Sequence, residues 1–314
     1  MKHYMDIERL KEKYRDVFHK GEMVVIQEKI DGANASFTTQ VSDNGEIEVI
    51  AFSRKQQLSE DNTLRGFYEW TRNFPYRLLN EITENGRYII FGEWLVKHTV
   101  KYPESAYNKF YMFDVWDTFA ECYLSCTSVL HIYDQLKALL FGYETDIYFV
   151  PMLYKGEFES FDKCAELVGT TMVGAEPCGE GIVIKSQDRL LDKADSERPI
   201  YIKIVDSRFS ETKMHKQKVP VDPATAEKMK TDAELVASIV TERRVSKILE
   251  KMVDEGQLRP DWDEKDLGFI AKSACKLVYD DCLKEEPEIA SKVDNFGKLC
   301  GKQTMAIVRG LVTS

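Results

Sequence analysis

The sequence lacks the features of a membrane, secreted or zinc-ribbon protein. No apolar run approaches the roughly 20 residues that cross a bilayer, and the N-terminal stretch is charged every few residues where a signal peptide would be apolar. The seven cysteines are odd in number and form no C-x-x-C pair, so neither a disulfide framework nor a zinc ribbon is indicated. We expect reduced thiols and a cytoplasmic protein.

Basic residues are also in deficit. The chain has 43 Lys and Arg against 53 Asp and Glu, a net charge of −10, which alone argues against a protein that binds a phosphate backbone. Between Lys203 and Lys218, however, five basic residues stand against Asp206 and Glu211. This local strip fits a phosphate-binding groove, although charge alone is equally consistent with a solvated surface.

The 314 residues are enough for two domains, one large and one small. Residues 1–218 contain short runs rich in β-branched and aromatic residues, and turn signals such as Asp43-Asn44-Gly45 favour antiparallel or mixed sheets. Helical spacing and strand patterns together predict an α+β domain. Its predicted helices span 7–17, 62–82, 124–140 and 160–168, and its predicted strands span 23–26, 35–39, 47–52, 88–91, 110–115, 182–184 and 201–204.

Residues 219–314 show helical periodicity and no strand pattern. Asp222-Pro223 is a typical helix start, and apolar residues then recur at helical spacing from Leu235 to Met252. A second helix is predicted from Leu267 and should end before Pro287, and a third region follows it. We therefore predict a small, all-helical C-terminal domain.

The first chemical signal is Glu28-Lys29-Ile30-Asp31-Gly32, directly after the apolar strand 23–26. A lysine amine attacks phosphorus only when deprotonated, so it needs a partly desolvated site or cationic neighbours. A strand end followed by a glycine turn provides such a site. Taken alone, the same residues also fit a hairpin turn with a surface lysine.

Four further motifs follow in order, and their residue types suit one reaction. Carboxylates can bind ribose hydroxyls or magnesium, an aromatic ring can stack on a base, and lysines can neutralise phosphate charge. The motifs are Phe91-Gly92-Glu93, Tyr111-Met112-Phe113-Asp114, Glu180-Gly181-Ile182-Val183-Ile184-Lys185 and Ile202-Lys203.

This series resembles the covalent nucleotidyltransferases, which comprise ATP-dependent DNA ligases, RNA ligases and mRNA capping enzymes. Within them the chain is most similar to the RNA ligase 2 family of T-even phages and relatives. That similarity rests on the seven residues at 28–34, on Arg208-Phe209-Ser210-Glu211 and on the helical tail with Arg243-Arg244-Val245. It implies a nucleotidyltransferase (ATP-grasp-like ligase) domain at 1–218 and a helical domain at 219–314.

The resemblance also assigns roles to residues. Lys29 would form the lysyl-AMP bond, Glu93 would contact the ribose, and Phe113 would stack on adenine. Without the resemblance, Phe113 fits a core residue of the sheet as well as it fits an adenine contact. Arg54 then fits a solvent-exposed arginine without a role in the reaction. The predicted site comprises Lys29 as nucleophile, Glu180 as ligand of Mg²⁺ or Mn²⁺, Lys185 and Lys203 on phosphate, Glu28 beside the nucleotide, and Asn34 and Arg54 acting on the RNA ends.

One position departs from the family pattern. The last motif usually has two lysines, K-x-K, whereas Lys203-Ile204-Val205 has valine in the second place. Either Arg208, Lys213 or Lys216 supplies the missing charge, or one of the chemical steps is impaired.

The expected function is that of an ATP-dependent RNA ligase, acting as a monomer on nicked duplex RNA. One alternative is an ATP-dependent DNA ligase or a capping-type guanylyltransferase. Another is a non-catalytic RNA-binding homologue, for which Val205 is the motivating feature. Basic residues of the helical tail, including Arg243, Arg244 and Lys247, fit either a grip on RNA or ordinary surface charge.

Overall fold

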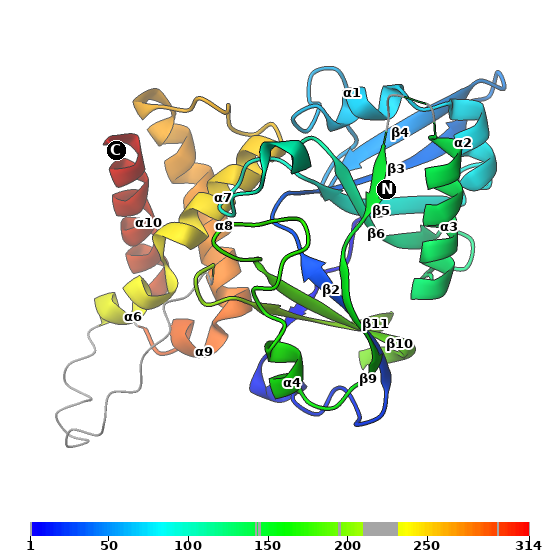
Figure 1. The fold of residues 1–314 in the computed structure, drawn as a ribbon. Coiled ribbons are helices and arrows are strands. Elements are labelled where there is room, and N and C mark those ends of the chain that lie inside the picture. Colours follow the sequence, from blue (N-terminus) through cyan, green and yellow to red (C-terminus); the bar gives the residue numbers. More distant parts are fainter. Residues whose placement is uncertain are drawn as a thin grey trace. The chain divides into compact units, whose positions relative to one another are not determined.

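The computed structural model describes residues 2–141, 143, 146–193, 196–209, 232–293 and 295–313, with the backbone alone for 188–193, 196–198 and 313. It divides into two compact units, Met1–Asp206 and Ser207–Ser314 (Figure 1). The predicted boundary between residues 218 and 219 lies outside the described residues. The predicted Asp222-Pro223 helix start lies outside them too.

A five-stranded sheet of the first unit carries the nucleophile motif. Its order is β1 (Glu8–Arg9), β11 (Ser196–Val205), β10 (Gly181–Lys193), β2 (Met23–Lys29) and β9 (Met152–Glu157), and only the β1–β11 pair is parallel. One face packs Val24, Ile26, Ile182 and Ile184 into a core with Phe158, which precedes α4 (Phe161–Ala165). Since side chains alternate across a strand, the opposite face carries Lys29.

A second, six-stranded sheet lies above it in the same unit (Figure 1). Its order is β4 (Ile47–Ser53), β3 (Ala33–Val41), β5 (Tyr88–Trp94), β6 (Phe110–Asp117) and β7 (Cys122–Tyr123), with β8 (Ile147–Phe149) pairing parallel to β6. The helices α1 (Phe67–Arg72), α2 (Tyr76–Ile82) and α3 (Cys126–Leu139) pack against one face. The other face carries Asn34 and Glu93 together with an aromatic cluster that includes Phe91 and Phe113.

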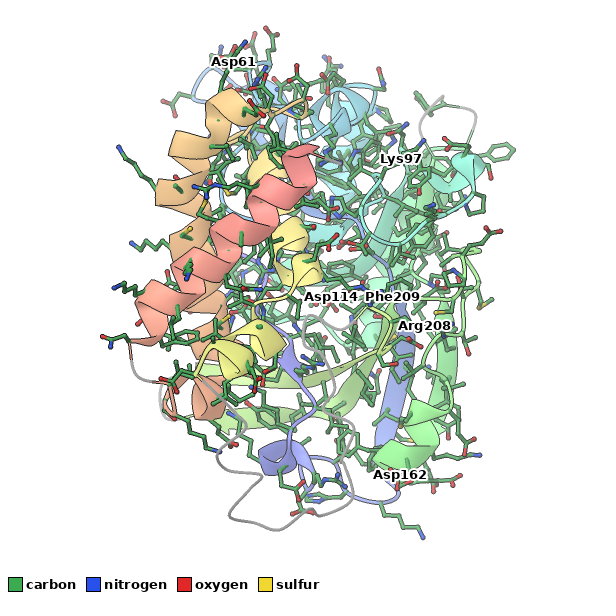
Figure 2. The ribbon with its side chains drawn as sticks, turned by 90° about the vertical axis from the view of Figure 1, so that its left-hand side faces the viewer. Asp61, Lys97, Asp114, Asp162, Arg208 and Phe209 are labelled. Atoms are coloured by element: carbon green, nitrogen blue, oxygen red, sulfur yellow. The ribbon has the colours of Figure 1, made fainter. Side chains whose placement is uncertain are left out.

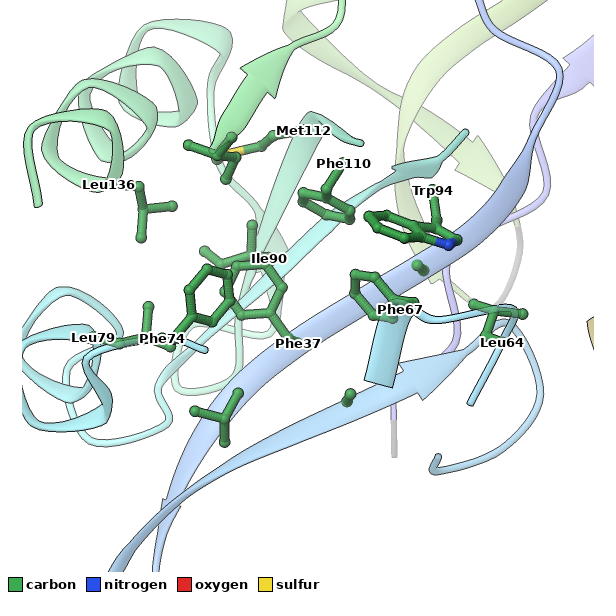
Figure 3. Packing of buried hydrophobic residues seen from close by; sticks show 14 of the residues in the cluster. Phe37, Leu64, Phe67, Phe74, Leu79, Ile90, Trp94, Phe110, Met112 and Leu136 are labelled. Atoms are coloured by element: carbon green, nitrogen blue, oxygen red, sulfur yellow. The ribbon is translucent and has the colours of Figure 1, made fainter. Parts of the chain in front are cut away.

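The largest core of the first unit fills the space between these helices and the second sheet. Figure 3 shows Phe37, Phe67 and Phe110 at its centre, with centroids of neighbouring rings 5.4 to 5.5 Å apart. All three side chains are fully buried. Such packing holds β3, β5 and β6 rigidly, and these strands carry the predicted ribose, adenine and RNA-end residues.

The second unit is helical throughout its described part, as predicted. It contains α6 (Asp232–Ile239), α7 (Glu242–Asp254), α8 (Leu267–Glu285), α9 (Pro287–Ala290) and α10 (Phe296–Thr313), with a 3-10 turn at Glu264–Asp266. Arg244 is fully buried; its Nε lies 2.9 Å from an Asp281 carboxylate oxygen, and its Nη1 donates to the Ile239 carbonyl. Arg244 therefore braces helices within the unit and is not surface charge.

The α+β class and all seven predicted strands are confirmed, with β1, β7, β8 and β9 in addition. The helix predicted at 7–17 is wrong: this segment forms β1 and a 3-10 turn at Glu12–Tyr14. The edge of β11 needs backbone partners, and the segment provides them, as in the 3.1 Å bond from the Leu10 amide to the Lys203 carbonyl. This tertiary pairing overrides the local helical pattern.

Other predicted helices exist but are shorter or divided. The 62–82 segment breaks at Asn73–Pro75, because proline ends the preceding helix and begins the next. The helix predicted over Leu235 to Met252 is divided into α6 and α7, and Thr241 caps α7 by accepting a hydrogen bond from the Arg244 amide.

All seven cysteines are free. Within the described ranges, the helices are all too short or too polar to traverse a bilayer.

We expect Phe37→Ala to destabilise the first unit by about 3–5 kcal/mol, because it removes a fully buried ring and leaves a cavity among three aromatic neighbours. Urea denaturation followed by tryptophan fluorescence measures this loss. Phe119→Ala is the matched control, since the Phe119 side chain is 87% exposed. Equal midpoints for the two variants would contradict the assigned core.

Candidate active site

Two motifs far apart in the chain meet at Lys29, the predicted nucleophile. Lys29 ends β2 and stands opposite Gly181, the first residue of β10. Its Nζ donates to Oε2 of Glu180 at 2.6 Å, although the two residues are 151 positions apart. The Lys29 side chain is 22% exposed and that of Glu180 only 2%. The amine is thus desolvated on most sides and still reachable.

The glycine turn after Lys29 packs directly onto β5. A Cβ at Gly32 would lie 2.6 Å from the Trp94 carbonyl oxygen, so only glycine allows this approach. The Gly32 amide then donates to Oε1 of Glu93 at 3.0 Å. Asp31 fixes the same turn, because its Oδ2 accepts from the Val100 amide at 2.9 Å. In this motif, the turn after Lys29 is therefore docked onto the second sheet.

Glu93 lies beside the Lys29–Glu180 pair and has an altered acidity. Burial is the main reason that its pKa is raised to about 7; the nearby charge of Lys29 opposes this rise and that of Glu180 adds to it. Asn34 stands opposite Glu93 in the β3–β5 register, so both side chains belong to the same face. The predicted ribose ligand and one predicted RNA-end residue are thus neighbours.

The carboxylates suit a divalent cation that is shared with phosphate. No group of three or more His, Cys, Asp or Glu side chains that would cage a metal occurs in the part of the chain that the structure describes. Mg²⁺ is usually held by one or two carboxylates together with substrate phosphates. Glu180, with Glu93 close enough for their like charges to interact, fits that mode of binding.

Lys203 shares the face that carries Lys29. Lys203 stands opposite Val183, and Val205 opposite Gly181, which in turn stands opposite Lys29. The missing second lysine of the last motif thus falls in the same cross-strand row as the nucleophile. Of the proposed substitutes, Arg208 is exposed and belongs to the second unit, while Lys213 and Lys216 lie outside the described residues.

Lys185 and Phe113 lie where the two sheets meet. The Nζ of Lys185, from β10, donates to Oδ2 of Asp114 at 2.9 Å and to the Phe113 carbonyl at 3.0 Å, both on β6. The Tyr201 hydroxyl donates to the other Asp114 oxygen at 3.2 Å. Asp114 lies inside the unit, whereas Asp61 and Asp162 are at the periphery (Figure 2). In this structure the Lys185 ammonium therefore forms an ion pair with the buried Asp114 carboxylate.

A bulge in β6 brings Phe113 and Asp114 to the same face. The β5–β6 register shifts between Phe91 and Gly92, so that Phe91 stands opposite Asp114 and Gly92 opposite Met112. Phe113 is the extra residue, and such an insertion redirects the side chains around it. The Phe113 ring is half-buried, so part of it stays accessible.

Two predicted site residues are engaged elsewhere. Glu28 points to the core face of the sheet, opposite Ile182, and its carboxylate accepts from the Thr171 hydroxyl at 2.6 Å and the Met172 amide at 2.8 Å. Burial raises the pKa of Glu28, and these two hydrogen bonds oppose the rise. Arg54 forms an ion pair with Asp6 and keeps 41% of its side chain exposed.

Sequence reasoning missed three residues that organise the site. Tyr4 fell in the segment ahead of a predicted helix and gave no signal at all. Asp114 was part of a motif, and its signal was a charged residue inside an otherwise apolar strand. The Tyr102 hydroxyl accepts from the Asp31 amide at 2.9 Å. Because the two residues are 71 positions apart, no local sequence pattern could predict this contact.

Comparison with known proteins gives a family match. The family model described as RNA ligase matches residues 22–205, which is more than half of the chain. No curated protein matches. Similar solved structures are of RNA ligase from Naegleria gruberi: a point mutant with ATP and Mn (18% identity, TM-score 0.48) and the ligase with PPi (19%, TM-score 0.46). Each match covers 65% of this chain and 56% of the Naegleria chain, so this chain spans little more than half of those proteins.

We expect the stability of the unliganded protein to fall as pH rises between about 4.5 and about 7. The folded state keeps the Glu93 proton up to about pH 7, whereas the unfolded chain releases it near 4.5, so deprotonation favours unfolding in this window. Glu93→Gln keeps an acceptor for Gly32 and removes the ionisation. It should exceed the wild type in stability at pH 8 by about 2–3 kcal/mol, with no such gain at pH 4. Urea titrations at several pH values measure this; a difference that is independent of pH would contradict it.

Proposed function

This chain belongs to the RNA ligase family, and we propose that it joins RNA ends in an ATP-dependent reaction through a lysyl-AMP intermediate on Lys29. The observation that carries the proposal is the convergence of Lys29, Glu180 and Glu93 on one site from three separate motifs. Taken alone, each motif could be explained by a purely structural role. Together they provide a reachable amine, a carboxylate for metal and a carboxylate for sugar hydroxyls.

In the first step, the Lys29 amine attacks the α-phosphorus of ATP. A P–N bond forms, the bond to pyrophosphate breaks, and the amine loses its proton. The Lys29 Nζ lies 2.6 Å from Oε2 of Glu180 in the free protein, so this contact must open before attack. A divalent cation, Mg²⁺ or Mn²⁺, held at Glu180 would neutralise charge on the phosphates.

The later two steps use the covalent AMP. The 5′-phosphate of an RNA end attacks the lysyl-AMP phosphorus, which restores the free amine and gives an RNA-adenylate. A neighbouring 3′-hydroxyl then attacks the RNA 5′-phosphorus and displaces AMP. Asn34, beside Glu93, is suitably placed for the ends. Lys203 meets phosphate from the same face as Lys29.

The preference for nicked duplex RNA, the monomeric state and the cytoplasmic location stay predictions. Recognition of RNA by A-form shape and 2′-hydroxyls leaves no short signature in sequence. DNA-joining or guanylyl-transferring variants of the function are separated by assays with nicked DNA and with GTP. A binding-only homologue is separated by its failure to acquire AMP.

Lys29→Ala and Lys29→Arg should both abolish AMP attachment, because alanine has no amine and the arginine guanidinium is not nucleophilic. Intact-protein mass spectrometry after incubation with ATP and Mg²⁺ detects the gain of one AMP on the wild type. Lys97→Ala is the control, since Lys97 is an exposed lysine that pairs with Glu104. Addition of nicked duplex RNA should then remove the AMP as the strand is sealed.

An AMP adduct on Lys29→Ala would refute the nucleophile assignment. Adduct formation without sealing of RNA, followed by sealing of nicked DNA, would move the chain to the DNA-joining alternative. Absence of any adduct with ATP or GTP on an initially unadenylated wild type would favour the binding-only reading.

We expect Val205→Lys to accelerate the first step by about tenfold, because it adds a cation in the cross-strand row of Lys29. Single-turnover adenylation at saturating ATP measures the rate. Val41→Lys adds the same charge at an exposed position of the same unit and should leave the rate unchanged. Equal rates for the two variants would show that position 205 does not face the reacting phosphate.

A further inference from the structure

The N-terminal strap, residues 2–9, crosses from one sheet of the first unit to the other. Its end pairs with β11 as β1, where Arg9 stands opposite Lys203. Its beginning lies on the β6–β7 edge of the second sheet, where the Lys2 ammonium sits 3.3 Å from the Trp116 ring centroid and the Met5 amide donates to the Tyr123 hydroxyl. The strap therefore lies on the face of the second sheet that carries Phe91 and Phe113.

Tyr4 is the buried residue at the centre of this strap. Its hydroxyl donates to Oδ2 of Asp114, the same oxygen that accepts from Lys185. Burial, with the charge of Asp114 as the next cause, raises the pKa of Tyr4 well above its ordinary value, so the hydroxyl stays a donor. Asp114 is 2% exposed and Lys185 4%. A buried ion pair is favourable only when its remaining lone pairs and protons are satisfied, and Tyr4 supplies one of those bonds.

The Tyr4 ring also packs against Phe113. The two ring centroids are 4.9 Å apart at an interplanar angle of 55°, and the Phe91 ring centroid lies 5.2 Å from that of Tyr4. Tyr4 is 8% exposed, while Phe113 is half-buried. Phe113 is thus braced on one side and accessible on another, as a ring that stacks on a base must be.

We propose that Tyr4 is a positioning residue of the nucleotide site, which holds the Phe113 ring and the Lys185–Asp114 pair in the arrangement that binds ATP. This inference rests on the proposed function, because it takes Phe113 as the adenine contact. Tyr4 itself does not touch the reacting atoms. It acts through the ring that it supports and through the carboxylate that it hydrogen-bonds.

Two substitutions separate these contributions. Tyr4→Phe keeps the ring and removes the bond to Asp114, whereas Tyr4→Leu removes the ring as well. We expect Tyr4→Phe to raise the ATP concentration for half-maximal Lys29 adenylation by about tenfold, since a hydrogen bond to a buried charged group is lost. Tyr4→Leu should raise it further, and the maximal rate of either variant should stay within about threefold of the wild type.

The experiment measures single-turnover AMP attachment by intact mass across a series of ATP concentrations. Tyr133→Phe, in which a half-buried hydroxyl is lost from α3, is the control and should match the wild type. A merely structural role of Tyr4 would lower the fraction of active protein and leave the half-saturating concentration unchanged. That result, or a half-saturating concentration in Tyr4→Phe equal to that of the wild type, would overturn the proposal.

Equilibrium dialysis of ATP against Lys29→Ala, with and without Tyr4→Phe, tests the inference separately from the chemistry. Weaker ATP binding in the double variant supports the positioning role even if the wild type forms no adduct. Equal binding overturns that role while leaving the proposed function intact, provided that the wild type is adenylated. Failure of both proteins to bind ATP, together with no adduct on the wild type, would overturn the positioning role and the proposed function together.

Discussion

The ion pair between Lys185 and Asp114 is the contact on which the site depends, because it joins the two sheets from which the site is built. Lys185 belongs to β10 and Asp114 to β6, and both side chains are almost completely buried. Removing one partner of such a pair leaves an uncompensated buried charge, at a cost of about 3–5 kcal/mol. Tyr4 and Tyr201 complete the hydrogen bonding of the carboxylate, so four elements of the chain meet at one charge.

The nucleophile depends on the same arrangement of sheets. Lys29 and Glu180 lie on adjacent strands of one sheet, but the Lys29 turn docks on β5 of the other through Gly32 and Glu93. The spacing between the sheets therefore sets how deeply the amine is buried. It also explains the raised pKa of Glu93, whose carboxyl is enclosed near Lys29 and Glu180. The raised pKa of Glu93 and the partial burial of the Lys29 amine both follow from how the two sheets face each other.

The structure also separates two kinds of motif residue. Lys29, Glu180 and Glu93 come together at the candidate site and are the residues to which we assign chemical roles. Asp31 and Gly32 fix the turn, through the Val100 amide and the approach to Trp94. Glu28, although adjacent to Lys29 in sequence, is turned to the opposite face of the sheet and anchors the loop at 171–173.

The sequence by itself determined seven of the strands, the α+β class and the helical character of the tail, because alternation of apolar residues and turn chemistry are local properties. It did not determine the N-terminal segment, where pairing with β11 replaced the helix that its spacing predicted. Nor did it reveal the bulge at Phe113, which turns neighbouring residues of β6 to one face. The partners of Lys185 were decided by tertiary structure alone, since Asp114 and Tyr4 reach it only once the two sheets and the strap are packed together.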